Sequence, residues 1–125
     1  MAERCLCESG NVAVFACSGG SNVGQLANLA AVDLARSSNE CRFYCLAGIG
    51  GHVSGITESA RAADRVVAID GCKVSCGRRA LEHAGIEVDL HLVLTEMGME
   101  KNHELDVEQE VREAAARWIR EAMGS

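Results

Sequence analysis

Four of the seven cysteines in this chain fall where predicted strands pass into loops: Cys17, Cys45, Cys72 and Cys76. Three hydrophobic runs, NVAVFAC, CRFYC and RVVAIDGC, each end on one of the first three, and Cys76 follows Cys72 by four residues. Because the carboxyl ends of parallel strands share one edge of a sheet, we expect these four thiols to converge there. Four thiolates in a small volume are typical ligands for a soft metal ion or reactants in redox chemistry.

The elements that must position these cysteines alternate regularly along the chain. Hydrophobic runs predict strands over 11–17, 41–47, 65–72 and 88–96. Helical spacing of apolar residues predicts helices over 23–38, 52–63 and 106–123, and a further helix after Cys72 that ends near His83. Asn22 and Asp106 are the expected N-caps and Gly85 the expected C-cap. This order predicts an α/β fold, a three-layer α-β-α, doubly wound and mostly parallel four-stranded sheet of Rossmann-like type.

Composition limits the classes of function. A chain of 125 residues, 48% hydrophobic, is expected to form a single α/β domain over residues 11–125 after an N-terminal tail, 1–10. A net charge of −6 and an aromatic content of 3% argue against a nucleic-acid partner, which would favour a basic face or a stacking platform. The apolar stretches are too short to cross a bilayer, and the N-terminus lacks the apolar core of a signal peptide, so a cytoplasmic protein without membrane association is expected. The sequence does not identify a protein partner.

Cysteine usage in a chain without a signal peptide favours metal or redox roles over disulfides. Closed sites with four cysteines usually hold structural zinc, so we expect one zinc ion, with an iron–sulfur cluster on the same ligands as the alternative. The spacing contains no CxxC pair and matches no common zinc ribbon. Cys5 and Cys7 are assigned to the tail without a role, with extension of a soft-metal site or resolution of a thiol as the alternative. Cys41, at the start of the second strand, is interpreted as structural.

Three segments of the sequence resemble the DGC-domain family, which is named for its Asp-Gly-Cys motif. They are CSGGSNVGQLAN from residue 17, CLAGIG from residue 45 and IDGC from residue 69, and the resemblance covers roughly residues 11–101, including TEMG at 95–98. The family is described as zinc-binding through four cysteines, with no established biochemical function. Carried over residue by residue, the resemblance implies Cys17, Cys45, Cys72 and Cys76 as the chelators, and it implies no reaction.

The alternative to a metal site is a thiol-based enzyme. Cys72 and Cys76 would then carry redox, persulfide or oxyanion chemistry, and the stretch from Cys72 to Arg78 matches the C-x5-R thiolate loop of cysteine phosphatases. The loop SGGSNVG has the hydroxyls and glycines of a phosphate-binding turn but lacks the lysine of a Walker A motif. A third possibility is a partner-binding module that uses the acidic C-terminal helix.

Other residues near the predicted edge have structural interpretations. Asp70 is expected to cap the helix that follows Cys72, with a role as a base or in supporting a ligand as the alternative. His52, which follows GIGG, is the histidine nearest the predicted edge, but four cysteines leave no need for it as a ligand. The acidic run over 96–113 is interpreted as a solvated face, and Trp118 is expected to be buried.

Overall fold

The computed structural model describes residues 11–124, so Cys5 and Cys7 lie outside the described residues. The strands are β1 (Val12–Ala16), β2 (Cys41–Phe43), β3 (Arg65–Asp70) and β4 (Leu90–Val93). The helices are α1 (Asn22–Ser37), α2 (Leu46–Gly50), α3 (Ser54–Ala62), α4 (Cys76–His83) and α5 (Gln109–Ala122), and a 3-10 turn, η2 (Leu94–Met97), follows β4.

The four strands form one parallel sheet in the order β2-β1-β3-β4, as expected for a doubly wound fold. The central strands β1 and β3 pair over their whole overlap, from Val12 opposite Arg65 to Ala16 opposite Ile69. All five residues of β1 are buried because helices cover both faces of the sheet. The chain leaves β1 towards β2 on one side and reaches β3 on the other, so the topological switch point lies between β1 and β3.

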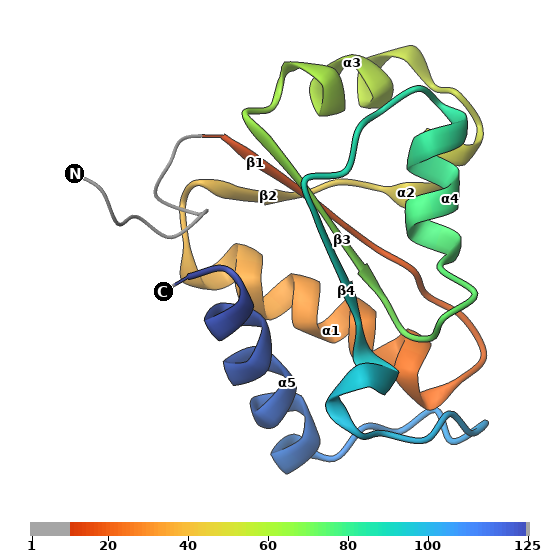
Figure 1. The fold of residues 1–125 in the computed structure, drawn as a ribbon, viewed down its shortest axis with the longest axis vertical. Helices are drawn as coiled ribbons and strands as arrows, with labels where there is room; N and C mark the ends of the chain where they lie inside the picture. Colours follow the sequence, from red (N-terminus) through yellow and green to blue (C-terminus); the bar gives the residue numbers. More distant parts are fainter. Residues whose placement is uncertain (1–10, 125) are drawn as a thin grey trace.

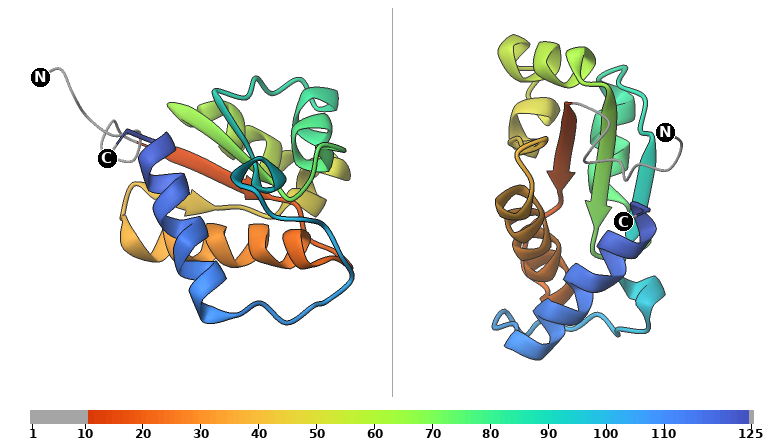
Figure 2. Two further views of the ribbon diagram at one scale, coloured as in Figure 1. Left: turned by 60° about the horizontal axis from the view of Figure 1, so that its bottom comes forward. Right: turned by 90° about the vertical axis from the view of Figure 1, so that its left-hand side faces the viewer.

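Two hydrophobic clusters separate the three layers. Alternate side chains of β1 point to opposite faces: Val12 and Val14 join α1 and α5 in one cluster, and Ala13 and Phe15 join α2, α3 and α4 in the other. Figure 1 shows α1 and α5 together on one side of the sheet, with α3 and α4 on the other, and the left view of Figure 2 shows α5 lying across α1. The expected three-layer α-β-α fold is therefore confirmed.

Strand β2 is shorter than predicted. It ends at Phe43, and residues 46–50, expected as strand end and turn, form the short helix α2. The reason is that β2 pairs with β1 only as far as Phe43 opposite Val14, after which the amide of Tyr44 donates the last bond, of 3.0 Å, to the carbonyl of Val14. Ile49 then turns into the core from α2. Cys45 is consequently the N-cap of a helix and does not end a strand.

The helix boundaries also differ in detail from the prediction. Ser21, and not Asn22, caps α1, with its hydroxyl accepting a hydrogen bond of 3.0 Å from the amide of Gly24. Helix α5 begins at Gln109 after Glu108, and not after Asp106. Gly85, with φ of +78°, ends α4 as expected.

Helix α5 covers the edge of the cluster that contains α1. Ile119 and Met123 are buried, whereas Trp118, expected to be buried, is only half-buried against the same cluster. None of the helices within residues 11–124 combines the length and the apolar character needed to span a membrane.

Candidate functional site

A pocket of about 220 Å³ opens at the switch point, between the carboxyl ends of β1 and β3. The loop 17–21 leads from β1 into α1, and the loop 71–75 leads from β3 into α4; the two loops and the segment 98–107 gather at one end of the sheet in Figure 1. The amide of Cys17 extends the ladder past β1 by donating to the carbonyl of Ile69 at 3.1 Å. The pocket is lined by Cys17, Ser18, Gly19, Gly20, Ser21, Val23, Gly24, Gly71, Cys72, Cys76, Lys101 and His103.

Three of the four candidate cysteines line this pocket: Cys17 from β1, Cys72 from the loop after β3, and Cys76 from the start of α4. Cys45 is exposed at the start of α2 and does not line it. Within the described part of the chain, no group of three or more His, Cys, Asp or Glu side chains is arranged to hold a metal ion. The three thiols are ligands that suit a soft metal ion, but the described side chains are not arranged as a closed metal site. Cys41 lies at the opposite end of the sheet and is buried.

Cys17 is the deepest of the pocket thiols. Burial raises its pKa to about 11, the amide of Gly71 opposes this by donating to its sulfur at 3.1 Å, and the nearby carboxylate of Asp70 raises the pKa further. Without a cation in the pocket, Cys17 is a protonated thiol at neutral pH.

The Asp-Gly-Cys motif has a physical explanation in which each residue has a separate role. Gly71 passes directly against the first turn of α1, and a β-carbon there would lie 2.6 Å from the carbonyl carbon of Val23 and 2.9 Å from the amide of Gly24. Only glycine permits this approach of one backbone to another, and the approach brings the Gly71 amide to Cys17. The motif thus joins the two loops of the pocket.

Asp70 caps α4, as expected, although it lies six residues before the helix begins. Its carboxylate, 1% exposed, accepts hydrogen bonds from the amides of Gly77 at 2.7 Å and Arg78 at 3.1 Å. A β-carbon on Gly77 would lie 2.9 Å from the Asp70 oxygen, so the cap depends on glycine there. Ser75, the residue at the N-cap position, has a left-handed backbone and makes no side-chain cap.

His91 is a partner of Asp70 that sequence reasoning missed. Its Nε2 lies 2.8 Å from the Asp70 carboxylate, and its side chain is 16% exposed. His91 is the register partner of Ala68, two residues before Asp70, so both side chains lie on the same face of the sheet. The polar residue His91 within the mostly apolar strand β4 is visible in the sequence. Its contact with Asp70 can be inferred only when β4 is known to pair with β3.

Lys101 and His103 also belong to the pocket and were missed. The Nζ of Lys101 lies 3.5 Å from the sulfur of Cys72. Asn22 holds their segment in place: its amide side chain donates to the carbonyl of Glu100 at 2.9 Å and accepts from the amide of Asn102 at 2.7 Å. Both side chains are exposed, as the prediction of a solvated face over 96–113 requires, but their place at the pocket was not predictable, because nothing local in the sequence relates this segment to the start of α1.

Two other predicted candidates point away from the pocket. The guanidinium of Arg78 pairs with Glu82 one turn along α4, at 2.9 Å, so the C-x5-R arrangement does not direct this arginine at Cys72. His52 faces His83, and neither lines the pocket. In the glycine-rich loop, the Ser21 hydroxyl is used by the cap of α1, and the Gly19 carbonyl accepts from Gln25 at 2.8 Å.

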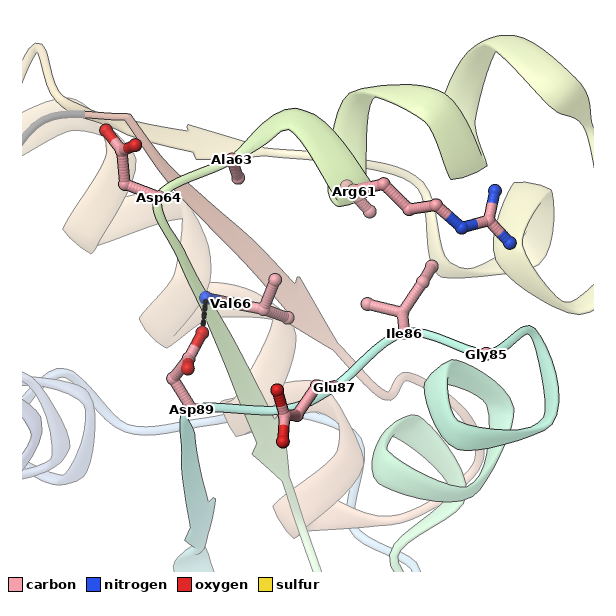
Figure 3. A pocket seen from close by; sticks show the side chains of 9 residues that line it. Arg61, Ala63, Asp64, Val66, Gly85, Ile86, Glu87 and Asp89 are labelled. Carbon is pink, nitrogen blue, oxygen red and sulfur yellow. Dashed lines mark hydrogen bonds between the residues drawn. The ribbon is translucent and has the colours of Figure 1, made fainter.

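A second pocket, of about 260 Å³, lies at the opposite end of the sheet (Figure 3). Three of its polar side chains make hydrogen bonds to the backbone of neighbouring segments. Asp89 accepts from the amide of Val66 at 2.7 Å, Asp64 accepts from the amide of Asn11 at 3.0 Å, and Arg61 donates to the carbonyl of Ala84 at 2.8 Å. We therefore assign this pocket a structural role.

Comparison with known proteins identifies the family of the chain and one relative. The model of the DGC-domain family matches residues 13–119, which include all four candidate cysteines and the Asp-Gly-Cys motif. The chain is 40% identical over 95 residues to the anaerobic and virulence modulator AnvM of Pseudomonas aeruginosa, covering 76% of this chain and 72% of that protein. No solved structure matches the chain.

Proposed function

The chain belongs to the DGC-domain family, and from this membership we propose that it binds one zinc ion through the cysteines at the switch point. Cys17, Cys72 and Cys76 would supply three ligands and Cys45 the fourth. The observation that supports this most is that three thiols, from two loops 54 residues apart, line one pocket. The bound ion would stabilise the two loops against each other by replacing thiol protons with a shared cation.

Cys45 is the ligand that has to move in this proposal. Tetrahedral zinc with Zn–S bonds of about 2.3 Å requires neighbouring sulfurs roughly 3.8 Å apart. Strand β2 lies next to β1, and Cys45 follows its last residue by two positions, so it starts about one strand spacing, roughly 5 Å, from the end of β1. Its side chain is exposed and makes no capping bond in α2, and it is therefore available for the ion.

We further propose that the site is regulatory. The relative from Pseudomonas aeruginosa is named as an anaerobic and virulence modulator. Reactive oxygen species oxidise cysteine thiolates in successive steps, and an oxidised cysteine no longer binds the metal ion. A cysteine site that holds zinc under reducing conditions and releases it on oxidation would give this chain a response to the absence of oxygen.

The test is metal analysis of protein purified without oxygen. We expect one zinc per chain by native mass spectrometry, and loss of the ion in Cys17→Ser and in Cys72→Ser. Cys41→Ser, at the opposite end of the sheet, should keep the ion. Equal metal content in all three variants would contradict the site, and a brown protein with visible absorption would replace zinc by an iron–sulfur cluster.

One observation favours thiol chemistry as a second candidate. Lys101 places an ammonium 3.5 Å from the sulfur of Cys72, in a pocket that is open to small molecules. A cation at this distance stabilises a thiolate, which is the nucleophilic form of cysteine. Metal-free protein in which Cys72 reacts with a thiol reagent faster than the other cysteines, and in which Lys101→Met abolishes that advantage, would support this candidate over zinc binding.

A further inference from the structure

Two histidines far apart in the sequence meet on the face of the molecule that carries α2, α3 and α4. His52 lies in the turn between α2 and α3, and His83 is the last residue of α4. The Nε2 of His52 is 3.3 Å from the Nδ1 of His83, and both side chains are exposed. The rings are nearly perpendicular, with an interplanar angle of 81° and centroids 5.3 Å apart. Neither residue lines the cysteine pocket.

The backbone holds His52 in this position independently of His83. Its φ is +57°, and within residues 11–124 only one other residue apart from glycine, Ser75, has a positive φ. The amide of His52 donates to the carbonyl of Ile49 at 3.1 Å, and the next amide donates to the carbonyl of Gly48 at 2.8 Å. A left-handed conformation is unfavourable for a residue with a side chain, yet the glycine immediately before it has a negative φ. The imidazole is thus held by a turn whose left-handed backbone conformation glycine would adopt at lower energetic cost.

We infer that His52 and His83 form a two-ligand site for a divalent late transition-metal ion such as zinc or nickel. Two nitrogens bound at about 2.05 Å to a tetrahedral ion lie roughly 3.3 Å apart, which is the distance observed between the two ring nitrogens. Either ring nitrogen of a neutral histidine can bind a metal. Two perpendicular rings can bind the same ion without a steric clash between them. The exposed position leaves the other coordination positions to water.

The same contact can be a hydrogen bond between the two rings, with the donor set by the tautomer, so a metal ion would have to displace the shared proton. The pair is exposed to water, which competes with that hydrogen bond for both nitrogens. Because the described residues supply no third metal-binding side chain beside the pair, binding would be weaker than at a closed site and selective for ions that prefer imidazole. The inference does not depend on the cysteine site.

The experiment follows the imidazole resonances of ¹⁵N-labelled full-length protein by NMR while zinc is added. We expect the ring signals of His52 and His83 to shift together, at the same zinc concentrations. His103 lines the cysteine pocket and reports zinc there, so the two sites are read separately. Unchanged signals of His52 and His83 at several equivalents of zinc would overturn the inference, whatever His103 does.

Two variants test whether the rings act as a pair. His83→Gln should weaken zinc binding at His52 by roughly 100-fold, the usual effect of losing a second ligand held in place. His52→Gly removes the other ligand and suits the positive φ, so it keeps the turn even if the first variant folds poorly. If the remaining histidine shifts at unchanged zinc concentrations in either folded variant, the two rings do not share an ion and the site does not exist.

Discussion

Replacing Gly71 by alanine should force apart the two loops that form the cysteine pocket. The φ of Gly71 is not positive, so alanine can adopt the backbone conformation, and the whole effect comes from the added methyl group. That methyl group would lie 2.6 Å and 2.7 Å from the carbonyl carbon and oxygen of Val23. Both neighbours are backbone atoms in the first turn of α1, which cannot turn aside as a flexible side chain can.

The expected cost follows from the displacement that is needed. Ordinary contact begins at 3.4 Å, so the loop must move by about 0.8 Å relative to α1 in a region of close packing. Overpacking of this kind costs about 1–3 kcal/mol, and weakening the bond from Gly71 to Cys17 adds about 1 kcal/mol. Alanine recovers about 0.5 kcal/mol by restricting the unfolded chain. We expect a net loss of about 1.5–3.5 kcal/mol, equivalent to a fall in Tm of about 10 °C for a domain of this size.

Urea denaturation followed by the fluorescence of Trp118 measures this loss. Trp118 is the single tryptophan and is half-buried against the core, so its emission reports unfolding. Gly55→Ala is the matched control, because it lies in α3 with no atom within 4 Å of the added methyl group and should be neutral or slightly stabilising. A Gly71→Ala variant with the same midpoint and slope as the wild type would refute the argument that this contact fixes the two loops.

Two further substitutions test interactions that hold the helices around the sheet. Asp70→Asn should lower the free energy of unfolding by about 2–3 kcal/mol in urea denaturation, because an amide can keep only part of the bonds to α4 and His91 and leaves a buried donor facing a donor; a variant as stable as the wild type would contradict the capping role. Asp33→Asn removes the paired bonds of 2.7 and 2.8 Å by which Arg112 of α5 is tied to α1, at a cost of about 1 kcal/mol at neutral pH. Those bonds hold the pKa of Asp33 below its ordinary value of 3.8, so their contribution is present above that value and is lost as the pH falls through the lowered pKa. The stabilities of wild type and variant should therefore converge in acid, and a difference that stays constant with pH would show that the ion pair is not its source.

Most of the fold could be predicted from periodicity along the chain. The alternation of apolar runs with helical spacing predicted four parallel strands and the helices between them, and the structure confirms this. The errors lie at element ends, as in the helix that replaces the predicted turn at 46–50 and the later start of α5. Local signals there were overridden by burial of Ile49 from α2 and by the edge position of β2.

The site could be predicted only in part. Cysteines at strand ends are visible in the sequence, and Cys17, Cys72 and Cys76 do line one pocket. The contributions of Lys101 and His91 were not predictable, because each depends on contacts between segments that are far apart in the chain.

The amino-acid sequence alone determined which side chains lie at the carboxyl ends of strands, because this depends only on where each apolar run ends. Which of those ends become neighbours was decided by the order β2-β1-β3-β4, which comes from packing the helices on both faces and has no local signature. This order places Cys17 beside the loop of Cys72 and leaves Cys45 beyond the end of the outer strand β2. The close approach of Gly71 to α1 arises in the same way, from two backbones that meet only when the sheet is complete.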